Sequence, residues 1–226
     1  MGSRLSRYIS SVRRRNERRV LLVGVDGAGK TSLVKYYKSR GASTSSFSTS
    51  SSGSSSSSTS SGKSSSSSNT TTSTSSSTTT STTSPRDFDV HSIKVPAKKT
   101  RAGLIFQVWD IGGQNSVRPY WRHYYTGTQG VIFVVDASEQ GQARLAEVVG
   151  ELSAMASDEQ LAGCSILILG NRCDSPGALS SERLSSQLGL DNILAGHTWR
   201  ITMCDTLTGK GLDDGLDFLG DTMREL

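Results

Sequence analysis

The residues best suited to chemistry form a glycine-rich stretch, residues 24–31, which reads GVDGAGKT. It matches the pattern G-x-x-x-x-G-K-[ST] and follows an apolar run at residues 20–25, as a strand-to-helix turn would. Glycines at these spacings let successive backbone N–H groups point at phosphate oxygens, and the start of a helix adds positive potential there. Lys30 is then expected to reach the β- and γ-phosphates, and the Thr31 hydroxyl to ligate Mg²⁺. The predicted nucleotide-binding residues here are Gly24, Val25, Asp26, Gly27, Ala28, Gly29, Lys30, Thr31 and Ser32.

A second motif, WDIGGQ, occupies residues 109–114 at the end of an apolar run. Asp110 can hold Mg²⁺ through water, Gly113 can offer its N–H to a γ-phosphate, and Gln114 can orient the attacking water. On its own, D-x-G-G is a common turn. After a phosphate-binding loop, it predicts a γ-phosphate sensor with Gln114 as the catalytic residue.

A third motif, NRCD, occupies residues 171–174 directly after the apolar run SILILG. The Asp174 carboxylate can accept hydrogen bonds from the N1–H and N2 groups of guanine, which adenine does not offer. Asn171 is expected to tie this loop to the nucleotide. Asn and Asp are common in turns of any kind, so the motif alone indicates little. Its position directly after a predicted strand is what favours a guanine-binding loop.

The three motifs together resemble the ADP-ribosylation-factor (Arf) and Arf-like small GTPases of the Ras superfamily, whose motifs read GLDxAGKT, WDxGGQ and NKxD. The resemblance continues through RPYWRHYYTGTQGVIFVVDAS at residues 118–138 and resumes at LTGKGLDDGLDFL. It implies a GTP-binding, GTP-hydrolysing switch that uses GTP/GDP and Mg²⁺ and acts in vesicle-mediated transport. It also implies slow hydrolysis that an activating protein completes, an exchange factor, and effectors.

The resemblance assigns further residues. Effectors of that family read an exposed aromatic set that corresponds here to Phe88, Trp109 and Tyr124, for which ordinary core packing is the alternative. Cys204 and Asp205 occupy the place of the family's last base-contacting motif, and Asp205 stands where a small residue is usual.

Another departure concerns the guanine loop. Arg172 replaces the lysine whose stem lies along the base, and an arginine stem can serve the same purpose.

The N-terminal arm, residues 1–18, combines two membrane signals. It begins MGSRLS, which fits the pattern for myristoylation of Gly2, and apolar residues recur in it at helical spacing between arginines. The arginines are Arg4, Arg7, Arg13, Arg14, Arg15 and Arg18, with Arg19 just beyond the arm. The prediction is an amphipathic helix that attaches to a membrane surface through acylated Gly2 and these arginines. A solvated basic tail is the alternative.

The predicted fold is a three-layer α/β P-loop NTPase domain over residues 19–226, with a six-stranded, mostly parallel sheet. Apolar or alternating runs predict strands at residues 20–25, 88–95, 104–109, 130–136, 165–170 and 199–204. The second of these alternates as an edge strand would and forms a hairpin with the third. Helices are expected at residues 31–40, 139–156, 178–188 and 212–223.

A Ser/Thr tract interrupts this domain at residues 43–84, where 37 of 42 positions are Ser or Thr. Such a composition cannot offset the ordering entropy of the backbone, so the whole tract is predicted to be disordered. Family members place a threonine that ligates Mg²⁺ three residues before the position of Phe88, and Pro85 stands there instead. Thr83 or Ser84 is left as a substitute ligand. The tract is either a phosphorylation target or a tolerated surface expansion.

Composition excludes several other classes of protein. The formal charge of +5 comes largely from the arm and is not spread over a groove-sized face, so no nucleic-acid partner is expected. Three scattered cysteines do not form a disulfide or zinc framework. The expectation is a cytoplasmic monomer that is peripheral on an intracellular membrane when GTP-bound. A non-hydrolysing GTP-binding adaptor stays open as the alternative. An adenine-specific P-loop kinase does not fit, because it has no role for Gly113, Gln114 and Asp174.

Overall fold

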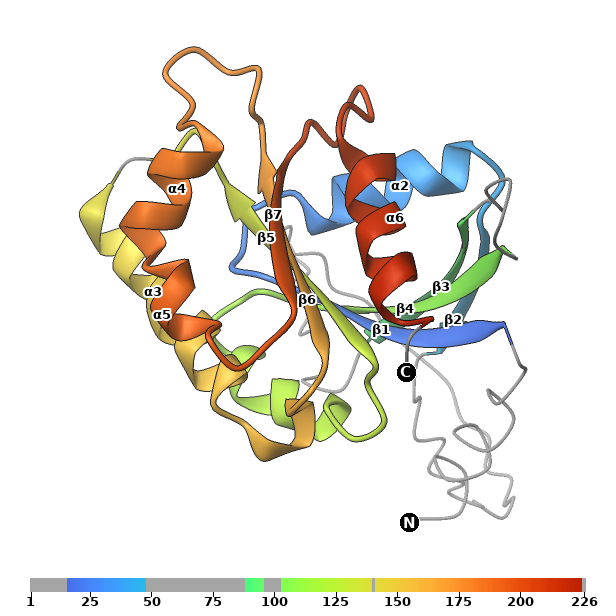
Figure 1. Ribbon diagram of the computed structural model, residues 1–226. Coiled ribbons are helices and arrows are strands. Elements are labelled where there is room, and N and C mark those ends of the chain that lie inside the picture. The colour runs from blue at the N-terminus through green and yellow to red at the C-terminus, as the bar shows by residue number, and fades with distance from the viewer. Residues whose placement is uncertain (1–15, 48–87, 96–102, 140, 225–226) are drawn as a thin grey trace, which may run out of the picture.

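The computed structural model describes residues 16–47, 88–95, 103–139 and 141–224. Within these residues the chain forms a central sheet with helices on both faces (Figure 1). The strands are β1 (Glu17–Val23), β2 (Ser43–Phe47), β3 (Phe88–Val95), β4 (Leu104–Ile111), β5 (Gly130–Asp136), β6 (Ser165–Asn171) and β7 (Trp199–Met203). The predicted N-terminal helix lies outside the described residues, and the last residues of the predicted arm, Glu17 and Arg18, belong to β1.

The helices follow the predicted alternation with strands. They are α2 (Lys30–Ser39), α3 (Gln142–Ala156), α4 (Ser181–Leu188), the short α5 (Leu190–Ile193) and α6 (Leu212–Thr222), with 3-10 helices η1 (Arg118–Tyr124) and η2 (Glu159–Leu161). In Figure 1, α2 and α6 lie on one face of the sheet, and α3, α4 and α5 lie on the other. Among the helices in these ranges, none is both long and apolar enough to cross a bilayer.

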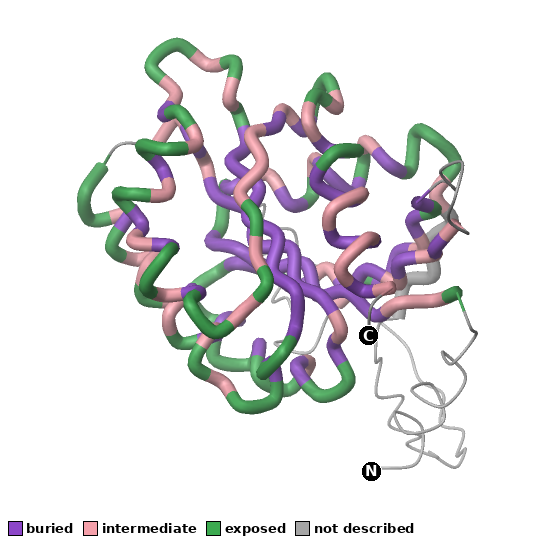
Figure 2. The backbone as a smooth tube through the Cα atoms, in the orientation of Figure 1, coloured by how far each residue is buried: buried purple, intermediate pink, exposed green. Residues whose placement is uncertain are grey.

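The strand order is β2-β3-β4-β1-β5-β6-β7. The pairs from β4 through β7 are parallel, whereas β2-β3 and β3-β4 are antiparallel, so the prediction of a mostly parallel α/β sheet is confirmed. The core lies where β1, β5 and β6 are covered on both faces, and nearly every residue of these strands is buried (Figure 2). Parallel strands end at one edge of the sheet, which is where each of the three motifs begins.

Two predictions about the sheet edge were wrong. The first residues of the Ser/Thr tract form β2, which pairs with β3 in a register that sets Phe47 opposite Phe88. Consequently the sheet has seven strands, and β2 rather than β3 is its outer strand. The physical reason is that the backbone groups of β3 offer a ladder of hydrogen bonds to any chain that runs beside them, whatever its side chains. The remainder of the predicted disordered tract lies outside the described residues.

Candidate nucleotide site

The glycine-rich loop, residues 24–31, connects β1 to α2 at the carboxyl edge of the sheet. Gly29 caps α2 with φ of 107°, and no side chain caps the helix, so the backbone N–H groups of its first turn are available to a ligand. A Cβ at Gly29 would stand 2.1 Å from Nδ2 of Asn171. Only glycine therefore fits at this position, on grounds of both conformation and space.

Lys30 is a buried cation at the base of this loop, with 7% of its surface exposed. Its Nζ donates to Gly24 O at 2.6 Å and to Val25 O at 2.9 Å. Burial lowers the pKa of Lys30 to about 8, while the nearby Asp110 opposes that shift. The ammonium is therefore charged at neutral pH and lies in a poorly solvated position, where its attraction for an anion is strong.

The second motif approaches the glycine-rich loop closely. A Cβ at Gly113 would stand 2.2 Å from Gly24 O and 2.3 Å from Nζ of Lys30. Asp110, at the end of β4, is half-buried, and burial raises the pKa of its carboxyl to about 6 despite the opposing charge of Lys30. Gln114 is exposed at the rim of the same cleft. The structure therefore brings the first two motifs together, as predicted.

A cavity of about 330 Å³ lies between these two motifs and β3. The residues that line it are Asp26, Gly27, Lys30, Thr31, Phe88, Asp89, Asp110, Gly112, Gly113 and Gln114. The Thr31 hydroxyl and the Asp110 carboxylate contribute hard oxygen donors of the kind that Mg²⁺ prefers, so this donor set fits that ion. Within the described ranges, no group of three or more His, Cys, Asp or Glu side chains gathers to form a site held by protein ligands alone.

The third motif is joined to the glycine-rich loop through buried Asn171. Its Nδ2 donates to Ala28 O at 2.8 Å, and its Oδ1 accepts from the backbone N of Thr206 at 3.0 Å. One side chain thus connects the glycine-rich loop, the end of β6 and the loop after β7. Cys204, in that last loop, is fully buried, and its carbonyl accepts from the backbone N of Cys173.

Arg172 and Asp174 lie on the exposed side of the same junction. Arg172 has a left-handed backbone, with φ of 60°. Its guanidinium donates to Gly27 O at 3.1 Å and pairs with Asp136. The Asp174 carboxylate pairs with Lys210, and this hydrogen bond lowers the pKa of Asp174.

Asp205 has a structural role within its loop. Its Oδ1 accepts from the backbone N of Leu207 at 2.8 Å, which closes a turn. Its own backbone N donates to Lys210 O at 3.0 Å. The side chain that departs from the family pattern is thus used to fold the loop.

The predicted aromatic set forms one cluster. Phe88 stacks on Trp109 at 4.7 Å between ring centroids, and Tyr124 meets Phe88 edge to face at 5.0 Å. Trp109 is buried, with 2% of its surface exposed, and Phe88 and Tyr124 are partly buried against the core. The expectation of an exposed set was therefore wrong for Trp109, and the alternative of core packing applies in part to the other two. Arg19 of β1 places its guanidinium 3.9 Å from the Trp109 ring centroid and donates to Tyr124 O at 2.8 Å.

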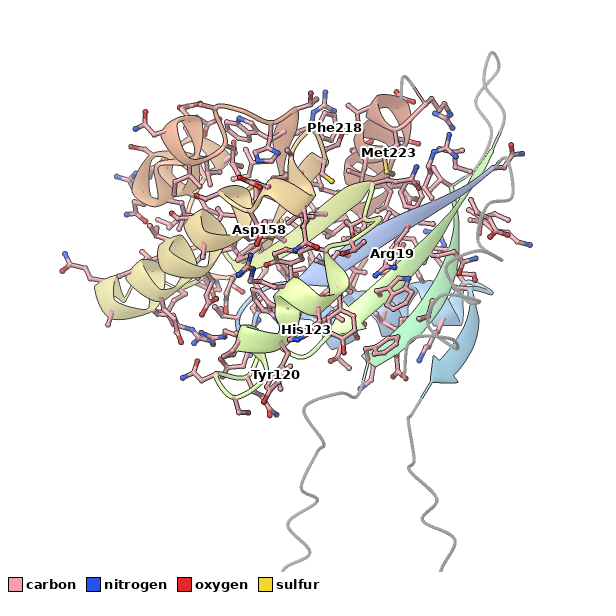
Figure 3. All side chains as sticks on the ribbon, turned by 90° about the horizontal axis from the view of Figure 1, so that it is seen from below. Arg19, Tyr120, His123, Asp158, Phe218 and Met223 are labelled. Carbon is pink, nitrogen blue, oxygen red and sulfur yellow. The ribbon has the colours of Figure 1, made fainter. Side chains whose placement is uncertain are left out.

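The buried face of Trp109 is thus occupied from within the fold. Figure 3 shows Arg19 on β1. It also shows Tyr120 and His123 on η1, and the centroids of these two stacked rings are 5.8 Å apart. Burial lowers the pKa of Arg19 to about 10.

Sequence reasoning missed two residues of this site. Arg118, at the start of η1, is buried and donates to Gly113 O at 2.7 Å and to the Asp26 carboxylate at 2.9 Å. Asp89 lines the cavity from β3. Arg118 is the first residue of the stretch at 118–138 that carries the resemblance, and this was the available signal. Its contacts across three elements do not follow from motif spacing, and the position of Asp89 depends on the register of β3 against β4. Of the other predicted residues, Gly2, Thr83 and Ser84 lie outside the described residues.

Comparisons with known proteins identify the family to which a chain with this site belongs. The model of the ADP-ribosylation factor family matches residues 65–223. ADP-ribosylation factor 1 of Brassica rapa subsp. pekinensis is 32% identical over 224 residues, which cover 99% of this chain and 98% of that protein. The chain belongs to the ADP-ribosylation factor family.

Other relatives within the Arf family point the same way. ADP-ribosylation factor 3 of Arabidopsis thaliana is 32% identical over 99% of this chain and 98% of its own length. ADP-ribosylation factor-like protein 1 of Saccharomyces cerevisiae is 41% identical over 54% of this chain and 65% of its own length. The fold is similar to that of the small GTPase Arl6 (BBS3) of Trypanosoma brucei, solved with the bound nucleotide analogue GppNp. That match has a TM-score of 0.63 and 23% identity, and it covers 92% of this chain and 98% of the other. As a member of the Arf family, this chain is a GTP-binding switch protein of the Ras superfamily.

Proposed function

We propose that this Arf-family protein cycles between GDP and GTP in the cleft described above, hydrolyses GTP slowly, and recruits effectors to a membrane when GTP is bound. The observation that carries the proposal is the convergence on one cavity of a glycine-rich helix start, a buried ammonium, two oxygen donors and Gln114. Each of these groups suits one part of a nucleoside triphosphate.

The phosphates are the part of the ligand that the chain is best equipped to bind. The start of α2, which has no side-chain cap, lines the cavity together with Lys30, so dipoles and a full charge would act on the same phosphate oxygens. When bound, Mg²⁺ would neutralise charge that develops on the phosphates, held by Thr31 and, through water, by Asp110. The exposed Gln114 side chain would orient the attacking water.

The purine base would be selected at the opposite end of the site. The Asp174 carboxylate would accept from the N1–H and N2 groups of guanine, and the Arg172 stem would lie along the base. Because Asn171 joins the base loop to the glycine-rich loop, binding at one end stabilises the other.

Attachment to a membrane is the third part of the proposal. Acylation of Gly2 and the arginines of the N-terminal arm would supply two signals, which together give durable binding to anionic lipid. The switch would then act in the cytoplasm as a peripheral protein on an intracellular membrane. An exchange factor, an activating protein and effectors would complete the cycle. We assign to effectors the partly exposed Phe88 and Tyr124, with the buried Trp109 packed against them as support.

The test of nucleotide binding compares GDP, GTP and ATP on the full chain. We expect GDP and GTP to bind, ATP not to bind, and Lys30→Ala to lose at least about tenfold in affinity for both guanine nucleotides. Lys35→Ala, at an exposed position on α2, is the matched control and should bind as the wild type does. Equal affinity of Lys30→Ala and wild type for GDP would refute the assignment of the site.

The test of hydrolysis is a single-turnover measurement with bound GTP. Wild type should release phosphate slowly, and Gln114→Leu should be slower still because it cannot orient water. If neither protein releases phosphate even with an activating protein present, the non-hydrolysing adaptor is the correct alternative.

A further inference from the structure

Asp89 lies directly opposite Asp110 in the antiparallel pair of β3 and β4. The register sets Phe88 against Ile111, Asp89 against Asp110, and Val90 against Trp109. Directly opposed residues of an antiparallel pair place their side chains on the same face of the sheet, about 5 Å apart at Cβ. Both carboxylates line the cavity that also contains Lys30 and Thr31.

Within the described residues, no cationic side chain pairs with Asp89 to offset the repulsion between these two carboxylates. Among the described residues, the Asp89 carboxylate makes no ion pair and no side-chain hydrogen bond, and the residue is exposed to the cavity. Two carboxylates directly opposite each other repel and destabilise a strand pair. Lys30 and Lys38 offset the charge of Asp110, but in the described ranges neither makes an ion pair with Asp89. The arrangement therefore favours a bound cation.

The oxygen donors that line the cavity indicate which cation would bind there. Mg²⁺ is held in nucleotide sites by one or two carboxylates, with phosphate oxygens and water completing the octahedron. Thr31, in the first turn of α2, lines the same cavity and carries a hydroxyl. A Thr31 hydroxyl with two carboxylates is such a donor set.

We infer that Asp89 is a third protein residue that holds the Mg²⁺ of the nucleotide, together with Thr31 and Asp110. The inference rests on the proposed function, because the ion is carried by the nucleotide. It offers a substitute for the threonine that Pro85 replaces, from a residue on β3 and not from residues 48–87. Metal binding would then depend on β3 and β4 and not on residues 48–87.

The test measures how Mg²⁺ slows the release of a fluorescent GDP from the full chain. The variants are Asp89→Asn, Asp89→Glu and the control Asp191→Asn, which removes one exposed carboxylate in the first turn of α5. For Asp89→Asn, the Mg²⁺ concentration that halves the release rate should rise about tenfold, the scale seen when a supporting metal contact is lost. Asp89→Glu should lie between wild type and Asp89→Asn, and Asp191→Asn should match wild type.

A second readout separates metal binding from a structural role. In EDTA, Asp89→Asn should bind GDP at least as tightly as wild type, because one negative charge next to the phosphates has been removed. An equal loss of GDP affinity with and without Mg²⁺ would overturn the inference, as would a Mg²⁺ response identical to that of Asp191→Asn. If wild type itself fails to bind GDP, the proposed function fails. If wild type binds GDP with Mg²⁺ dependence and Asp89→Asn does so equally, only the role of Asp89 fails.

Discussion

The Nε of Arg118 donates a hydrogen bond of 2.7 Å to the carbonyl oxygen of Gly113. The same guanidinium pairs with Asp26 of the glycine-rich loop and with Glu147 and Glu151 of α3. Only 3% of the Arg118 side chain is exposed, whereas its carboxylate partners are partly solvated. One buried cation therefore joins the two phosphate-side motifs to the helix behind them.

Removing this guanidinium should destabilise the fold. Arg118→Met keeps the buried stem but leaves the Gly113 carbonyl without this donor and removes one cation from three carboxylates, of which Asp26 and Glu147 keep Arg144. We therefore expect a loss of about 2–3 kcal/mol in the free energy of unfolding. Urea denaturation measures it. The matched control Arg183→Met, at an exposed position on α4, should change stability by less than about 0.5 kcal/mol. Equal effects of the two substitutions would mean that the Arg118 contacts contribute nothing.

The contribution of the Glu147 carboxylate to stability should depend on pH. Its hydrogen bond with Arg118, and then that with Arg144, hold the pKa of Glu147 below the ordinary value of 4.5. A carboxyl group whose pKa is lower in the folded state than in the unfolded state stabilises the fold at pH values above its unfolded-state pKa. This stabilisation is lost as the pH falls through the folded-state pKa. Wild type should thus exceed Glu147→Gln in stability at about pH 7, and the difference should shrink below about pH 4.5. A difference that grows on acidification would contradict this assignment.

The close approach of Gly113 to the glycine-rich loop predicts different effects of alanine at two adjacent positions. A Cβ at Gly113 would overlap Gly24 O and Nζ of Lys30, whereas a Cβ at Gly112 would meet Val117 no closer than 3.5 Å. Gly113→Ala should reduce GTP affinity at least about tenfold, because Lys30 or the loop must move. Gly112→Ala should stay within about threefold of wild type. Equilibrium titration with a fluorescent GTP analogue gives both values.

The register of β2 against β3 predicts that residues 48–87 can be removed. Phe47 and Phe88 are directly paired, so an Asn-Gly turn in place of residues 48–87 would close a two-residue hairpin. Thermal and urea unfolding should show stability raised by about 2 kcal/mol, because the chain between the two paired strands is much shorter and costs less entropy to close. A second deletion that also removes β2, residues 43–87, should lose that gain. If the hairpin variant is less stable than wild type, the pairing of β2 does not hold in solution.

The sequence predicted the strands whose side chains are buried on both faces, because β1, β5 and β6 are continuous apolar runs. It missed β2 because serine and threonine carry no apolar pattern, whereas β2 is identified by its backbone pairing with β3. The motifs located the glycine-rich loop, Asp110 and Asn171, since their spacing is local. Arg118 and Asp89 could not be found in this way, because their roles depend on which distant segments pack together.

The bond pattern of Asn171 has a consequence for nucleotide exchange. The buried side-chain amide of Asn171 forms one hydrogen bond with the backbone of Ala28 and one with the backbone of Thr206. The glycine-rich loop and the loop after β7 are therefore connected through one side chain. Leu207, the residue after Thr206, is exposed, so a protein that binds there could displace Thr206 and, through Asn171, Ala28. Under the proposed function, the base and the phosphates of the nucleotide would then be released together.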